Sequence, residues 1–185
     1  MDTPLYRANY ITPSGTGSEI WISPPHQFAR EHQNHWFPGW DHPLANLVIV
    51  LQESAVSFSN NTIQVTQEKD RRRGKFLSFS FDLVSALQTE DYLGDLFDPR
   101  TGFPIFSSSK MVWDDNAAIK ALLNYPVITW QNCSLVQHPV WKSKVYPGTV
   151  ATSAPQTVIK SCLAQIMPQY GWESQRTLTR LLDKI

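Results

Sequence analysis

A long proline-free segment near the middle of the chain constrains the fold more than any other feature. Between Gln67 and Glu90 there is no proline, and large apolar side chains recur at spacings of three and four residues. They are Phe76, Phe79, Leu83, Ala86 and Leu87. That period places them on one face of a helix. We therefore predict a long helix over 67–90 at the centre of the hydrophobic core.

Strand-like segments lie on both sides of this helix. SEIWIS at 18–23 alternates, NLVIVLQ at 46–52 is typical of a buried strand, and AVSFS and TIQVT around Asn60-Asn61 predict a hairpin. Further strands are predicted for VITW, CSLVQH and KVYPGTVATS, the last one interrupted at Pro147-Gly148. Strands and helices are interleaved without regular βαβ spacing, so we predict an α+β fold with a mainly antiparallel sheet flanked by helices.

Three shorter helices are predicted from their start signals. Ser23 before two prolines favours a helix that runs to about Trp36. Asp114 and Asp115 can cap the helix AAIKALLN, and Pro155 opens the helix PQTVIKSCLAQIM.

Length and composition limit the domain count and the function classes. The 185 residues fit one domain over 17–185, preceded by a segment, 1–16, that should be loose unless docked on the core. Equal numbers of basic and acidic residues, 16 each, disfavour nucleic-acid binding. The longest apolar run, 44–51, is too short to span a membrane. No targeting segment is recognisable, and two cysteines without a CxxC motif fit a reducing compartment, so a cytoplasmic location is expected.

The segment from Tyr92 to Pro155 contains the distinctive motifs. They comprise Asp95, Asp98-Pro99, Thr101-Gly102, Cys133, His138, Trp141 and Gly148. Together they resemble the methylmalonic aciduria and homocystinuria type D proteins, the CblD family of cobalamin trafficking. The resemblance extends from about Glu68 to Leu163 and follows an order: a helix ending at GDLFDP, a helix ending in LNYP, a strand with a cysteine, then HPVW. It implies a nitroreductase-like fold without tightly bound flavin.

The resemblance also implies a function. Members of the family carry cobalamin as cargo, act without catalysis, and dock on a type C cobalamin-processing protein or a cobalamin-dependent enzyme. Cys133 would be the candidate cobalt ligand, with His138 and Trp141 as possible lining residues. A homodimer is also possible on this reading.

The position of the thiol departs from the family pattern. The family has a Cys-Cys pair here and binds cobalt through the first cysteine, whereas this chain has Asn132 in the first place and Cys133 in the second. Adjacent side chains of a strand point to opposite faces, so Cys133 can serve only if it faces outward. From the residues alone, a buried packing cysteine is the more common interpretation.

Two other groups invite a functional interpretation and have a structural one. His32 and His35 are three residues apart, with His26 and His42 near in sequence, but a zinc site needs three or four ligands. Asp95 and Asp98 fit a turn around Pro99 better than an acid/base pair.

The basic run KDRRRGK at 69–75 leaves a second function open. Arg71, Arg72 or Arg73 could hold the phosphate of FMN in a flavin-dependent reductase, whereas a solvated charged face is the plainer interpretation. A third hypothesis is a scaffold or dimerisation module that has lost the family chemistry. The first hypothesis remains a non-enzymatic cobalamin adaptor.

Overall fold

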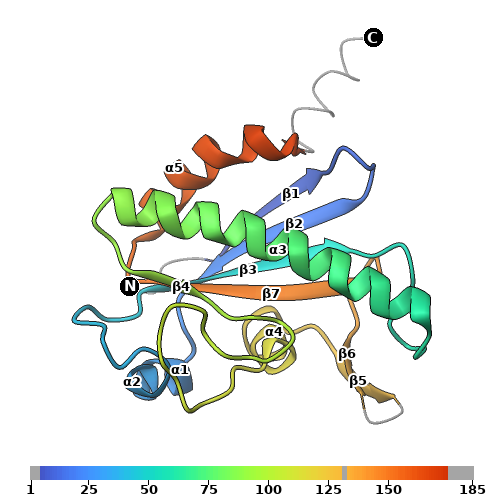
Figure 1. The fold of residues 1–185 in the computed structure, drawn as a ribbon, viewed down its shortest axis with the longest axis horizontal. Helices are drawn as coiled ribbons and strands as arrows, with labels where there is room; N and C mark the ends of the chain where they lie inside the picture. Colours follow the sequence, from blue (N-terminus) through green and yellow to red (C-terminus); the bar gives the residue numbers. More distant parts are fainter. Residues whose placement is uncertain (1–4, 131–132, 175–185) are drawn as a thin grey trace.

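The computed structural model describes residues 5–130 and 133–174. One six-stranded sheet has helices on both faces, with α3 and α5 on one face and α1, α2 and α4 on the other (Figure 1). Among the described residues, all neighbouring strands of this sheet pair antiparallel, in the order β4-β7-β3-β2-β1-β8. The strands are β1 (Tyr6–Ile11), β2 (Gly17–Ser23), β3 (Asn46–Glu53), β4 (Gly94–Leu96), β7 (Val145–Thr152) and β8 (Glu173–Ser174). The prediction of an α+β fold with a mainly antiparallel sheet is confirmed.

The long helix α3 (Ile63–Thr89) covers one face of the sheet and fills the largest core cluster. Phe76, Phe79, Leu83 and Leu87 are buried there, as their spacing predicts. Beside it lie α5 (Gln156–Ile166) and a short 3-10 turn, Met167–Tyr170. The predicted helix is confirmed, but it begins at Ile63 rather than Gln67.

The opposite face is covered by α1 (Gln27–Glu31), α2 (Gln33–Trp36) and α4 (Asp115–Leu123). A second core cluster lies under them, in which the Phe97 and Trp113 rings stack with centroids 4.7 Å apart and Trp36 meets Trp113 edge-on. Asp114 caps α4 as predicted, because its Oδ1 accepts the backbone N–H groups of Asn116 and Ala117.

The predicted hairpin over 55–66 is wrong. Thr62 is instead the N-cap of α3, and its hydroxyl accepts the Val65 N–H at 3.3 Å. The buried Val65 packs with Phe58 in a small cluster, so the apolar alternation of TIQVT serves the first turn of a helix. Two-residue alternation over five residues is also compatible with one helical turn.

Two other element boundaries differ from expectation. The helix expected to end at GDLFDP ends at Thr89, because Asp91 turns the chain at φ 61° and residues Gly94–Leu96 form β4. Pro147-Gly148 does not interrupt β7, which runs through both residues. The ring of Phe76 would lie 2.5 Å from a Cβ at Gly148, so α3 crosses β7 at a position that needs a glycine.

The N-terminal part of the chain is more ordered than the pattern suggested. Residues Tyr6–Ile11 form β1, which pairs along its whole length with β2. This part of the segment 1–16 is therefore docked on the sheet rather than loose. Ser23 does not cap a helix: it lies in β2 and its hydroxyl donates to the Pro24 carbonyl. The helix expected up to Trp36 is split at His32 into α1 and α2.

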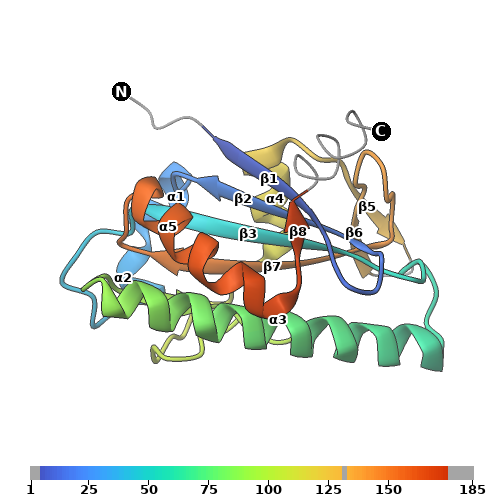
Figure 2. The same ribbon diagram turned by 90° about the horizontal axis from the view of Figure 1, so that it is seen from above.

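A separate two-stranded sheet is made of β5 (Val127–Trp130) and β6 (Cys133–Val136). Both views place this hairpin at the end of the molecule where α3 begins (Figure 2). It packs on α4 through Val127, Val136 and Ile119. Within the described residues, no helix has the length and apolar character that a membrane crossing requires.

Candidate functional site

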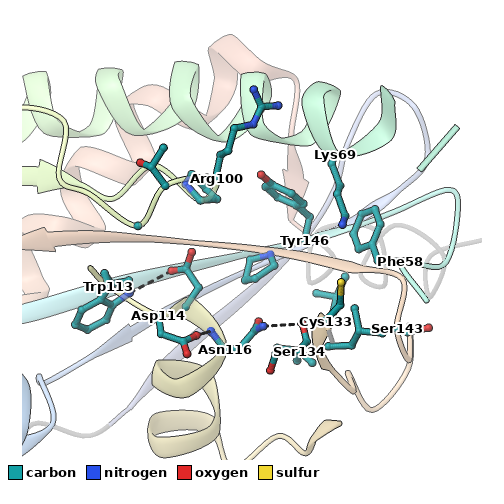
Figure 3. Close-up of a pocket in the computed structure, with 18 of the residues that line it drawn as sticks. Phe58, Lys69, Arg100, Trp113, Asp114, Asn116, Cys133, Ser134, Ser143 and Tyr146 are labelled. Carbon is teal, nitrogen blue, oxygen red and sulfur yellow. Dashed lines mark hydrogen bonds between the residues drawn. The ribbon is translucent and has the colours of Figure 1, made fainter. Parts of the chain in front are cut away.

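A cavity of about 460 Å³ opens between the first half of α3, the Pro99–Gly102 turn, the start of α4, β6 and β7 (Figure 3). Three aromatic rings line it, together with four charged side chains and one thiol. These residues are Phe58, Trp113 and Tyr146; Lys69, Arg100, Asp114 and Asp115; and Cys133. Its volume is in the range of pockets that hold drug-sized molecules, about 300–1,000 Å³.

Cys133 is exposed and lines this cavity from the first position of β6. It pairs with Trp130 of β5, and paired residues of antiparallel strands place their side chains on the same face. Leu135, two residues on, shares that face and is buried against Phe58 and Tyr146. The strand therefore turns the thiol towards the cavity rather than into the core. Asn132, the other position in question, lies outside the described residues.

The second cysteine has a different environment. Cys162 of α5 is fully buried in the main core, and burial raises the pKa of its thiol. A buried thiol with a raised pKa is a poor nucleophile and metal ligand. Of the two cysteines, only Cys133 is placed to meet a ligand.

His138 and Trp141 do not line the cavity that contains Cys133. They lie in the turn after β6 and border a smaller cavity of about 130 Å³. The His138 ring is buried and stacks on Trp141 with centroids 4.0 Å apart, and its Nδ1 accepts the N–H groups of Val140 and Trp141. Its Nε2 lies 3.1 Å from Glu19 Oε1. The structure thus separates the three residues that the sequence grouped.

Glu19 is the anchor of this turn on β2. Burial raises the pKa of its carboxyl, but the adjacent His138 imidazole and the hydrogen bonds from Arg7 and Trp21 outweigh that effect, so the pKa lies below its usual value. The carboxylate is therefore ionised and holds His138 against the sheet. The geometry gives His138 a positioning function in the turn.

Asp95 and Asp98 are turn residues, as expected. The buried Asp95 carboxylate accepts the backbone N–H groups of Leu96, Ile105, Phe106 and Ser107. This one side chain fixes the loop that follows β4, so its hydrogen bonds give it a structural function.

Asp98 forms an ion pair in addition to its hydrogen bond within the turn. Both of its oxygens accept from Arg73, each at 2.6 Å, and Oδ1 also accepts the Arg100 N–H. The Arg73 guanidinium holds the pKa of Asp98 below its usual value. The pair ties α3 to the Pro99–Gly102 turn that borders the cavity.

The basic run 69–75 is only partly a solvated face. Arg72 is fully buried, and its Nε donates to Glu68 Oε1 at 2.7 Å, while Arg71 binds the same carboxylate. Burial by itself would raise the pKa of Glu68, but the hydrogen bonds from the two arginines and the Ala55 N–H have the larger effect. The pKa is therefore lowered to about 2. The expectation of an exposed charged surface is therefore wrong for Arg72, because position 72 lies four residues from both Glu68 and Phe76, on the buried face of the helix.

The histidines do not form a metal centre. The His32 and His35 rings lie 5.6 Å apart, but the described part of the chain has no group of three or more His, Cys, Asp or Glu residues able to hold an ion.

Sequence reasoning missed three cavity residues. Asp115 was assigned only as a second helix cap, yet its Oδ1 accepts from Thr149 Oγ1 at 2.5 Å and Trp113 Nε1 at 3.2 Å. Burial raises the pKa of this carboxyl to about 6 against the effect of both hydrogen bonds. Tyr146 and Lys69 complete the set, and no motif points to them, since each is contributed by a different element.

The sequence of the chain matches a known protein family. The sequence profile of the family described as methylmalonic aciduria and homocystinuria type D protein matches residues 16–163, which is most of the chain. No curated protein matches the chain.

Proposed function

This chain belongs to the methylmalonic aciduria and homocystinuria type D protein family, and we propose that it acts in cobalamin metabolism as a non-enzymatic adaptor. In this function it docks on a partner that holds cobalamin and presents a thiolate to the cobalt. The partner in this proposal is a type C-like cobalamin-processing protein or a cobalamin-dependent enzyme. In this chain, the sheet with helices on both faces supports the nitroreductase-like architecture that the resemblance implies.

The observation that carries the proposal is the exposed thiol of Cys133 on the projecting β5–β6 hairpin. Thiolates are soft ligands that suit transition metals, and only an accessible thiol can reach a metal held by another protein. Although Cys133 occupies the second place of the family pair, its side chain faces outward, which meets the condition for coordination.

The size of the cavity supports an adaptor rather than a carrier. A volume of about 460 Å³ takes a drug-sized molecule, and an entire corrinoid is larger than that. Cobalamin would therefore stay on the partner, with its cobalt facing the rim where Cys133 lies. A docking interface then forms around the hairpin.

The flavin reductase hypothesis has less support. Arg71, Arg72 and Arg73 would be the phosphate ligands, but each guanidinium is already bound to a carboxylate of Glu68 or Asp98. Binding an FMN phosphate would require these ion pairs to be broken or shared, at a cost that is large for the buried Arg72.

The test is a visible-spectrum titration of the reduced protein with cobalamin, alone and with a type C partner. We expect a spectral change that the parent shows and Cys133→Ser does not, since a hydroxyl is a hard, protonated ligand. Cys162→Ala is the matched control, because it removes a thiol that cannot reach the surface.

Equal spectra for the parent and Cys133→Ser would remove Cys133 as a cobalt ligand. A yellow purified protein with flavin absorbance would instead favour the reductase. If Cys133→Ser and Cys162→Ala both abolish the change, the cause is a structural defect, and circular dichroism would show it.

A further inference from the structure

We propose that the Trp130 indole stacks on the corrin ring when the Cys133 thiolate binds the cobalt. This inference rests on the proposed function, because the cobalt bond brings the ring to the hairpin. In a cobalt(III) corrinoid, the thiolate replaces the axial water molecule, and the thiol proton passes to solvent. One Co–S bond forms and one Co–O bond breaks, so the step needs no oxidant or reductant.

Trp130 differs from the other tryptophans of the chain in its surroundings. The chain has seven tryptophans, and the other six all pack in one of the apolar clusters formed by the described residues. Trp130 lies outside all four of these clusters and is 50% exposed. Tryptophan is enriched among the residues that contribute most of the free energy at binding interfaces. An exposed indole at this position therefore indicates a contact with a ligand or partner.

The strand register places this indole beside the thiol. Trp130 of β5 is paired directly with Cys133 of β6. Side chains of directly paired residues lie on the same face of the hairpin, with Cβ atoms about 4.5–5.5 Å apart. The corrin ring surrounds the cobalt in the plane perpendicular to the axial bond. A ring whose cobalt is bound by Cys133 therefore extends over the position of Trp130.

The face that carries the thiol is apolar and open to solvent at this point. Ile128 shares the face with Trp130 and is 42% exposed, whereas Val127 and Val136 on the other face pack against α4. None of the described residues of β5 and β6 is charged, so covering this face with a ring desolvates no ion. The hairpin lies at one end of the molecule, where a partner that holds the corrinoid can approach it (Figure 2).

The first experiment measures the affinity of the chain for a type C-like partner that is either loaded with aquocobalamin or empty. We expect Trp130→Thr to weaken binding to the loaded partner about tenfold, the effect of one lost ring stack, and Trp130→Phe to weaken it less. Binding to the empty partner should stay unchanged. An equal loss with the loaded and the empty partner would place Trp130 against the protein and overturn the inference.

Thr129→Ala is the matched control. Thr129 is an exposed neighbour in the same strand, and its side chain points to the opposite face. The control should leave both affinities unchanged. Trp130→Thr keeps a β-branched residue in the strand, so the hairpin retains its strand propensity. If Thr129→Ala weakens binding to the loaded partner as much as Trp130→Thr does, the cause is a loosened hairpin and the inference is wrong.

The second experiment observes the indole directly. The chain is labelled with 5-fluorotryptophan, and the Trp130 signal in the fluorine NMR spectrum is the one that Trp130→Phe lacks. We expect this signal to shift when the partner loaded with aquocobalamin is added and to keep its position with the empty partner. An unchanged signal with the loaded partner would contradict the stacking contact.

The inference and the proposed function fail in different ways. If Cys133→Ser abolishes the visible spectral change but Trp130→Thr binds the loaded partner as tightly as the parent does, the inference fails and the proposed function stands. If Cys133→Ser keeps the spectral change, the proposed function fails, and the ring contact beside an axial thiolate fails with it.

Discussion

The Asp95 carboxylate should be the most costly single polar group to remove from this fold. It is buried and accepts four backbone N–H groups at 2.8–3.0 Å. For Phe106 and Ser107, it is the only acceptor among the described residues, whereas the Ile105 N–H also reaches the Leu96 carbonyl. Two amides therefore lose their only partner in Asp95→Ala.

The magnitude follows from that count. A hydrogen bond to a charged group contributes about 1.5–3 kcal/mol, so the loss of these two part-buried bonds in Asp95→Ala should lower the free energy of unfolding by about 3–6 kcal/mol. Asp95→Asn keeps the Oδ1 bonds and turns an NH₂ group towards the Ser107 N–H, so one amide is lost at about 1–3 kcal/mol. Since domains are stable by about 5–15 kcal/mol, both losses are large enough to measure.

The assay is urea unfolding followed by circular dichroism, with unchanged m-values as evidence of the same two states. Asp91→Asn is the control, because Asp91 is exposed at positive φ, a conformation that Asn tolerates, and it should change stability by less than about 0.5 kcal/mol. An Asn variant as stable as the parent, or an Ala variant no worse than Asn, would refute the reasoning.

Three further predictions concern other parts of the molecule. Gly148→Ala should lower stability by about 1–3 kcal/mol, seen as a lower Tm, because its Cβ would lie 2.5 Å from the Phe76 ring; an unchanged Tm would contradict the close crossing. Glu68, whose pKa falls to about 2 in the folded state, should contribute stability above its unfolded pKa that is lost as pH falls from about 5 to about 2; Glu68→Gln should flatten this part of the pH profile in acid titrations of unfolding. Maleimide should label Cys133 in the native protein and Cys162 only after unfolding, and mass spectrometry of the peptides would reveal the opposite order if the exposures were wrong.

The sequence predicted those parts of the fold that depend on local periodicity. The apolar face of α3, the buried strand β3 and the Asp114 cap follow from residues close together in the chain. The 55–66 hairpin failed because five alternating residues fit two periods, and only the cap at Thr62 and the packing of Val65 decide between them.

Of the residues that line the candidate cavity, the sequence singled out Cys133 as a possible ligand and gave no signal for Tyr146 and Lys69. Cys133 was found because a thiol is a distinctive group, but its orientation depends on the register with Trp130. Tyr146, Asp115 and Lys69 come from β7, α4 and α3, and nothing in their spacing brings them together. Long-range packing decides which side chains share a cavity, and that information is not local in the sequence.

The separation of the β5–β6 hairpin from the main sheet has a consequence for dynamics. A two-stranded ribbon is marginally stable by itself, and this one is held by contacts with α4 rather than by the ladder of the central strands. Its amide protons should therefore exchange with solvent through local opening, at a lower free energy than those of β3. Cys133 lies on the part of the molecule that can adjust its position while the sheet beneath stays closed.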